Sequence, residues 1–196
     1  AAAIRMHADL IEPRIVTEGS ESVNLIREEV ERITDLVNQW LFVARAHPPE
    51  RRPHDLVAML EDVGRRQKSA LTHAGTPLEI DAPGPVIVEC DKLRIEQVLR
   101  NLIVNSSQAT PEGGPIIAQV VVTAGVARLT IRDSGPGFTT EALARFGEPF
   151  FSEREGGMGI GLTLAREVIQ AHDGLIEASN HAEGGALVSI TLPLSS

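Results

Sequence analysis

Residues 133–167 read DSGPGFTTEALARFGEPFFSEREGGMGIGLTLARE, and the rest of the chain is arranged around this stretch. Apolar and polar residues alternate over residues 127–132 (ARLTIR), which predicts a β-strand that delivers Asp133. Gly135 and Gly137 let the backbone turn directly afterwards, where a side chain would clash. The sequence therefore predicts a carboxylate at a strand end, beside open backbone.

A second glycine cluster closes the stretch and leads into a helix. Gly156, Gly157, Gly159 and Gly161 precede apolar residues at helical spacing, which are Leu162, Leu164, Ala165, Val168 and Ile169. The bare N–H groups and the positive dipole at such a helix start favour an anion. We therefore expect one end of the stretch to hold a base and the other end to hold phosphates.

The spacing of these glycines excludes two common nucleotide-binding loops. Gly157, Gly159 and Gly161 form GxGxG rather than GxGxxG, no strand directly precedes them, and GxxxxGK[ST] does not occur. A nucleotide site here is thus neither a dinucleotide fold nor a P-loop. For each glycine taken singly, a plain flexible loop is the alternative.

Composition limits the class of protein. The chain has 196 residues, 42% of them apolar, which is enough for one ordinary domain plus an appendage. A net charge of −9 without a basic run makes nucleic acid an unsuitable partner. The single cysteine, Cys90, excludes an internal disulfide framework and fits a reducing compartment. Without a 20-residue apolar run or a signal peptide, we expect a cytoplasmic chain whose parent protein can be membrane-anchored.

Residues 1–46 are predicted to form a helical hairpin. The second helix has apolar residues every three or four positions, from Val23 to Ala44, as in a seam against another helix. Two helices cannot enclose a core, so we expect the hairpin to pair with a copy of itself into a four-helix bundle and make the protein a homodimer. The alternative is a hairpin that packs on its own chain's domain.

Residues 47–54 (HPPERRPH) are predicted to be a linker, because three prolines interrupt all periodicity. His47 and His54 flank it without metal-ligand partners at useful spacing, which favours solvated side chains. Residues 55–196 then form a second, larger domain, which contains the stretch quoted above.

That domain is predicted to be α+β. Asp55 and Asp91 are expected to cap helices that run to about residues 73 and 109. Strands are expected at 78–80, 86–89, 116–123, 127–133, 175–178 and 186–192. These elements predict an antiparallel or mixed sheet with its helices on one face.

An amide stripe marks the helix after Asp91. Asn101, Asn105 and Gln108 stand at i, i+4 and i+7, so they lie along one side. Amide oxygens suit Mg²⁺, which takes the rest of its shell from water and substrate phosphates. A solvated polar face is the alternative, although asparagine is a poor helix former.

Four segments resemble the boxes of one family. QVLRNLIVNSSQA (97–109), DSGPGF (133–138), FGEPFF (146–151) and GGMGIGL (156–162) resemble, in family order and spacing, the asparagine, first glycine, phenylalanine and second glycine boxes of sensor histidine kinases. These kinases belong to the gyrase, Hsp90 and MutL type of ATPase. The closest resemblance is to their nitrogen-regulatory branch. The resemblance implies a dimerisation hairpin followed by an α/β sandwich that binds ATP with Mg²⁺.

The resemblance assigns a role to individual residues. Asp133 would accept a hydrogen bond from the adenine amino group, and Gly135 and Gly137 would let adenine approach. Asn105 would ligate Mg²⁺, and Asn101 would act near the phosphates. The residues that wrap the triphosphate would be Gly157, Gly159, Gly161 and Leu162. Residues 139–156 would be a mobile ATP lid whose apolar clasp is Phe146, Phe150 and Phe151, with core packing as the alternative for these rings.

The sequence also departs from the family pattern. Ser152, Glu153 and Arg154 stand where Thr-Thr-Lys often follows the phenylalanines, so Arg154 is the expected cation for the γ-phosphate, unless it pairs with its neighbour Glu155. Met158 replaces a frequent threonine.

The start of the chain differs as well. Residues 1–5 (AAAIR) resemble the tail of the motif that carries the phosphorylated histidine, so we expect that histidine upstream of Ala1. His7 fits the motif poorly.

The function implied is transfer of the ATP γ-phosphoryl group to a histidine, for relay to an aspartate of a response regulator. Two alternatives stand beside it. A different ATPase of this type would carry a water-activating glutamate at the position of Asn101. A signalling adaptor without nucleotide binding would have no need of Asn105 and Asp133. We expect the 196-residue fragment to bind ATP but not to phosphorylate itself.

Overall fold

The computed structural model describes residues 48–153 and 159–195. The predicted hairpin 1–46, with its dimer interface and His7, lies outside the described residues, as does His47. From Pro48 onward the chain forms one compact unit. The fold below is that of this unit.

The unit is built on a five-stranded sheet with the order β2-β4-β5-β7-β6. Its strands are β2 (Leu78–Asp81), β4 (Ile116–Thr123), β5 (Val126–Arg132), β6 (Leu175–Asn180) and β7 (Ala186–Pro193). The β2–β4 pair is parallel and the other pairs are antiparallel, so the sheet is mixed, as predicted.

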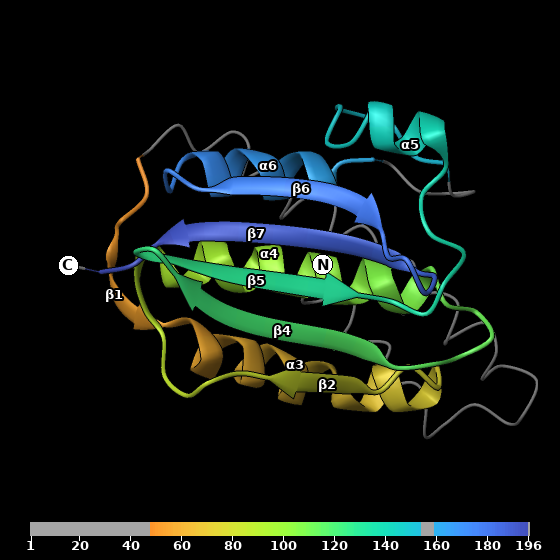
Figure 1. Ribbon diagram of the computed structural model, residues 1–196, viewed down its shortest axis with the longest axis horizontal. Helices are drawn as coiled ribbons and strands as arrows, with labels where there is room; N and C mark the ends of the chain where they lie inside the picture. The colour runs from red at the N-terminus through yellow and green to blue at the C-terminus, as the bar shows by residue number, and fades with distance from the viewer. Residues whose placement is uncertain (1–47, 154–158, 196) are drawn as a thin grey trace, which may run out of the picture. The chain divides into compact units, whose positions relative to one another are not determined.

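Three long helices cover one face of the sheet: α3 (Leu56–His73), α4 (Lys92–Gln108) and α6 (Gly161–Gln170). In Figure 1 all three lie behind the strands, with α4 packed between α3 and α6. Burial alternates along β4, where Ile116, Ala118 and Val120 face the helices and the residues between them are exposed. The core is thus a single layer between sheet and helices, which confirms the predicted architecture.

The largest side chains of this layer are almost fully buried. They are Leu56, Leu60, Ile95, Leu99, Leu102, Ile103, Ile116, Leu129, Ile131, Leu164, Ile169 and His172. The helix starts are where the sequence predicts them. The Asp55 carboxylate accepts a hydrogen bond from the N–H of Val57 (3.0 Å), and the Asp91 carboxylate accepts one from Arg94 (3.3 Å).

The predicted linker 47–54 is too long. Strand β1 (Arg52–Asp55) pairs antiparallel with β3 (Ile87–Cys90) in a separate two-stranded sheet, so residues 52–54 already belong to the domain. Pro53 cannot donate a ladder hydrogen bond, but a two-stranded sheet consists of edge strands, where proline is tolerated. Counting prolines therefore placed the boundary several residues late.

The first part of the predicted lid is helical rather than loop. Helix α5 (Thr140–Ala144) begins directly after Thr139, whose hydroxyl accepts a hydrogen bond from the N–H of Ala142 (3.0 Å). In Figure 1 this short helix stands apart from the other helices, beyond the end of β6. The end of the sheet where β5 and β6 finish is thus flanked by α5.

Candidate functional site

Asp133 follows β5 and has two differently used carboxylate oxygens. Its side chain is only 4% exposed. Oδ1 accepts hydrogen bonds from the N–H of Gly135 (3.0 Å) and of Ala186 (2.9 Å). Within the described parts of the chain, Oδ2 receives no hydrogen bond. The carboxylate is therefore held rigidly by one oxygen, and the other is left as an acceptor for a ligand.

The glycines after Asp133 are needed by the protein's own packing. A Cβ at Gly135 would overlap the carbonyl oxygen of Ala109, at the end of α4. A Cβ at Gly137, where φ is +83°, would lie 2.7 Å from the side-chain oxygen of Asn180. Close backbone approach was predicted at both glycines. The structure gives a protein contact as its cause, whereas the approach of adenine stays a prediction.

Both asparagines of α4 face the start of α6. Asn101 is 6% exposed, and its amide nitrogen donates to the carbonyl of Gly161 at 3.5 Å, whereas Asn105 is exposed. A Cβ built at Gly161 would lie 3.8 Å from the amide nitrogen of each asparagine. Ile160 stands at the cap position of α6, and within residues 48–153 and 159–195 no side-chain cap hydrogen bond is made to the first turn of this helix. Two amides and an uncapped helix start thus share one location, which suits an anion with its cation.

Helix α4 connects this location to Asp133. The N–H of Ala109 donates to the carbonyl of Asn105 (2.9 Å), so Ala109 lies one turn, or about 6 Å, further along the helix. The turn at Gly135 rests on Ala109. The Asp133 carboxylate therefore lies beside the last turn of α4, and the two asparagine amides lie on the turns before it. Gln108, the third amide of the stripe, is exposed.

The phenylalanine segment is organised around Arg145. Its guanidinium lies 4.0 Å from the ring centre of Phe151, and it pairs with Glu148 (2.7 Å) and Glu141 (3.3 Å). These partners, first Glu148 as the acceptor of a hydrogen bond from Arg145, raise the pKa of Arg145. Sequence reasoning missed this residue, although Glu141 and Glu148 stand four and three residues from it, a spacing at which helical charges pair.

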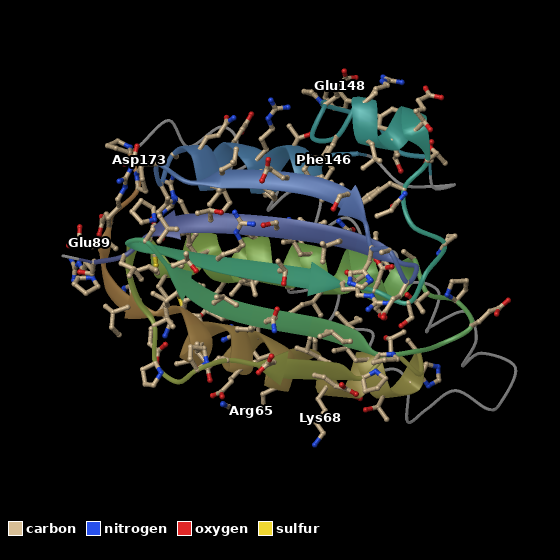
Figure 2. The ribbon with its side chains drawn as sticks, viewed as in Figure 1. Arg65, Lys68, Glu89, Phe146, Glu148 and Asp173 are labelled. Carbon is tan, nitrogen blue, oxygen red and sulfur yellow. The ribbon has the colours of Figure 1, made fainter. Side chains whose placement is uncertain are left out.

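The three phenylalanines have different environments. The ring of Phe146 meets that of Phe138 edge to face, with centroids 6.0 Å apart, and the carbonyl of Phe146 accepts from Arg166 of α6 (3.4 Å). Phe150 is 70% exposed with φ of +62°, so it is not a core residue. Figure 2 shows Phe146 and Glu148 at the α5 end of the domain.

Contacts within the described residues hold the two ends of the segment 139–153 in place. The hydroxyl of Thr139 hydrogen bonds to the carboxylate of Glu153. A Cβ at Gly159, where φ is +65°, would overlap the backbone of Phe151. The segment therefore starts beside the Asp133 turn and returns to the start of α6, where Leu162 is half-buried.

Some predicted site residues cannot be placed. Arg154, Glu155, Gly157 and Met158 lie outside the described residues. Over residues 48–153 and 159–195, no group of three or more His, Cys, Asp and Glu side chains is arranged to hold a metal. None of the helices in these two ranges has both the length and the hydropathy of a membrane span.

Comparison with known proteins places these features in a family. Residues 90–196 match the family described as histidine kinase-, DNA gyrase B- and HSP90-like ATPase. The C4-dicarboxylate transport sensor protein DctB of Pseudomonas aeruginosa is 33% identical over 97% of this chain and 33% of its own length. The signal transduction histidine-protein kinase BaeS of Escherichia coli is 27% identical over 98% of this chain and 44% of its own length.

A solved structure shares this fold. Full-length ShkA in complex with AMPPNP superposes with a TM-score of 0.81 and 25% identity, over 98% of this chain and 42% of that one. The chain thus spans less than half the length of these curated relatives.

Proposed function

Because the chain belongs to the histidine kinase-, DNA gyrase B- and HSP90-like ATPases, we propose that it is the ATP-binding, catalytic part of a two-component sensor histidine kinase. The observation that carries the proposal is the arrangement around α4. A buried carboxylate with one open oxygen lies near one end of this helix, and two amides face an uncapped helix start beside it. The asparagine box contains both amides, and the first glycine box begins at Asp133.

At the base end, Asp133 would select adenine. Its open Oδ2 can only accept a hydrogen bond, and the exocyclic amino group of adenine donates one. Guanine presents a carbonyl oxygen at the corresponding position, which would repel the carboxylate. Gly135 and Gly137 let the turn beside Asp133 pack closely against Ala109 and Asn180, so that adenine would meet a turn that the protein itself holds.

At the phosphate end, the donor set fits a magnesium–phosphate group. Asn105 supplies an uncharged oxygen ligand at the surface, and the uncapped N–H groups of α6 supply donors and positive dipole for phosphate oxygens. Asn101, held against Gly161, would fix the first turn of α6 beside them. Arg154 and Gly157 would complete the phosphate site. When bound, ATP supplies the phosphoryl group, and catalysis rests chiefly on its positioning.

The partners belong to the same proposal. The phosphoryl group would pass to a histidine expected upstream of Ala1, and from there to an aspartate of a response regulator. Residues 1–46 would form the homodimer and the lid would close over ATP, all in the cytoplasm. Membership of the nitrogen-regulatory branch stays a prediction.

Calorimetric titration of the 196-residue chain with ATP and Mg²⁺ tests the proposal. We expect binding by the wild type, none by Asp133→Asn, and no binding of GTP. Asp173→Asn is the matched control, since it makes the same change at an exposed residue at the other end of the domain (Figure 2). A wild-type chain that gives no heat with ATP would instead favour the adaptor.

Labelled ATP separates kinase from hydrolase. The chain alone should acquire no acid-labile label, whereas the natural protein that extends upstream should acquire it. Steady release of phosphate by the isolated chain would favour an ATPase with its own conformational cycle. Asn101 argues against that alternative, because an amide cannot act as a general base.

A further inference from the structure

Asn180, the last residue of β6, holds both backbone groups of one residue beside the site. Its side-chain oxygen accepts a hydrogen bond from the N–H of Phe138 (2.7 Å), and its side-chain nitrogen donates to the carbonyl of Phe138 (2.8 Å). The two residues are 42 positions apart in the chain. The side chain of Asn180 thus gives Phe138, a loop residue, the two backbone hydrogen bonds that a neighbouring strand would otherwise provide.

The approach of Asn180 depends on Gly137. A Cβ at this glycine would lie 2.7 Å from the side-chain oxygen of Asn180, and the φ of +83° disfavours any other residue. The two hydrogen bonds between Asn180 and Phe138, here called the clamp, can therefore form only with glycine at position 137. Phe138, once fixed, also holds Phe146 by the edge-to-face contact of their rings.

The same hairpin also fixes Asp133. Ala186, at the start of β7, donates to its Oδ1, and a Cβ at Gly185 would overlap its backbone carbonyl. Asn180 and Ala186 occupy the paired ends of β6 and β7. Both ends of the segment 133–138 are thus positioned by the β6–β7 hairpin.

We propose that Asn180 is a positioning residue of the nucleotide site, which orders the base-side turn 135–138 before the ligand arrives. The inference rests on the proposed function. A loop ordered on folding does not have to be ordered on binding, so pre-ordering raises affinity. Because Asn180 is exposed, its loss lowers affinity more than stability.

Titration of the full chain with ATP and with adenosine tests the role. In Asn180→Ala, both dissociation constants rise by the same factor, about tenfold, as expected for an effect on the shared base. Asn180→Asp behaves alike, since its second oxygen would face the carbonyl of Phe138. Glu177→Ala, at an exposed residue of the same strand, leaves both constants unchanged. Constants within twofold of the wild type overturn the role, as does a loss confined to ATP.

Hydrogen exchange provides a readout without nucleotide. The amide of Phe138 exchanges faster in Asn180→Ala and in Gly137→Ala than in the wild type or in Glu177→Ala. Unchanged exchange in the first two variants overturns the clamp itself. A wild-type chain that binds neither ligand overturns the proposed function, and the role of Asn180 with it. A binding-competent chain that tolerates Asn180→Ala overturns the role of Asn180 alone.

Discussion

At the scale of single residues, Asp133 has a structural and a binding oxygen, and two substitutions separate them. Asp133→Asn keeps a side-chain oxygen for the N–H groups of Gly135 and Ala186, whereas Asp133→Ala leaves the buried Ala186 donor unpaired. We expect Asp133→Ala to lower the free energy of unfolding by about 1–3 kcal/mol, and Asp133→Asn to lower it by less than about 1 kcal/mol.

Urea unfolding of the two variants and of the wild type measures this difference. ATP binding should be lost in both. Equal destabilisation of the two variants would show that Oδ1 does not hold the two N–H groups. Retained ATP binding by Asp133→Asn would instead contradict the role of Oδ2.

Single residues also show the limits of prediction from sequence. Asp133, Asn101 and Asn105 were predictable because strand alternation and helical spacing place them from their immediate neighbours. Asn180 was not, since its partner is 42 residues away and only the register of β6 and β7 brings the two together. A lone asparagine at a strand end carries no signal of such a contact.

At the scale of elements, helix α5 depends for its stability on side-chain contacts as well as on its own backbone hydrogen bonds. Its length, Thr140–Ala144, is far below that at which an isolated helix is stable. Arg145 joins its end to Glu141, Glu148 and the ring of Phe151. We therefore expect Arg145→Ala to loosen residues 139–153 while the global free energy of unfolding stays close to that of the wild type.

Hydrogen exchange and limited proteolysis of this segment measure the effect. Arg128→Ala, on the exposed face of β5, is the control and should leave both unchanged. If Arg145→Ala left exchange in 139–153 at the wild-type rate, the cation–π and ion-pair contacts would not be what holds α5.

The elements that sequence reasoning missed share a physical cause. The long helices and the sheet strands have a periodic apolar pattern, so they were found with ends within a few residues. Strand β1 contains Pro53, and α5 is shorter than two turns, so neither shows a period. Both form because residues outside the element supply a partner, β3 for the strand and the neighbouring Arg145 with Phe151 for the helix.

At the scale of the whole domain, His172 joins two helices far from the proposed ligand. Nε2 accepts a hydrogen bond from the N–H of Asp91 (2.9 Å), the cap of α4, and Nδ1 lies 2.7 Å from the carbonyl of Val168 in α6. The ring is 1% exposed. Burial lowers the pKa of His172; Arg51 and Arg94 lower it further, while the Val168 carbonyl and Asp91 act in the opposite direction.

The sign of the pH dependence follows. As pH falls, the histidine of the unfolded chain, with its ordinary pKa near 6.5, takes up a proton before the folded one does. The contribution of His172 to the free energy of unfolding is therefore fully present above this pKa and is lost as pH falls below it. We expect a loss of at most about 1.4 kcal/mol per pH unit from this group. Urea midpoints between about pH 7.5 and 5.5 measure it, a range that spans the ordinary histidine pKa. His172→Gln keeps an acceptor for the N–H of Asp91 and should make the urea midpoint less dependent on pH. If the midpoint of this variant fell as steeply with pH as that of the wild type, other groups would be the cause.

Cys90 offers a last test that links the whole fold to the ligand. It is fully buried in β3, and burial, with a smaller contribution from Asp91, raises its pKa to about 11. A thiol reagent at about pH 8 should therefore react only when the domain opens. Because ATP binds the folded state, saturation at about 100 times its dissociation constant should slow labelling about a hundredfold. Asp133→Asn should show no slowing. Rapid labelling of the native protein, unaffected by ATP, would mean that β3 opens independently of the nucleotide site.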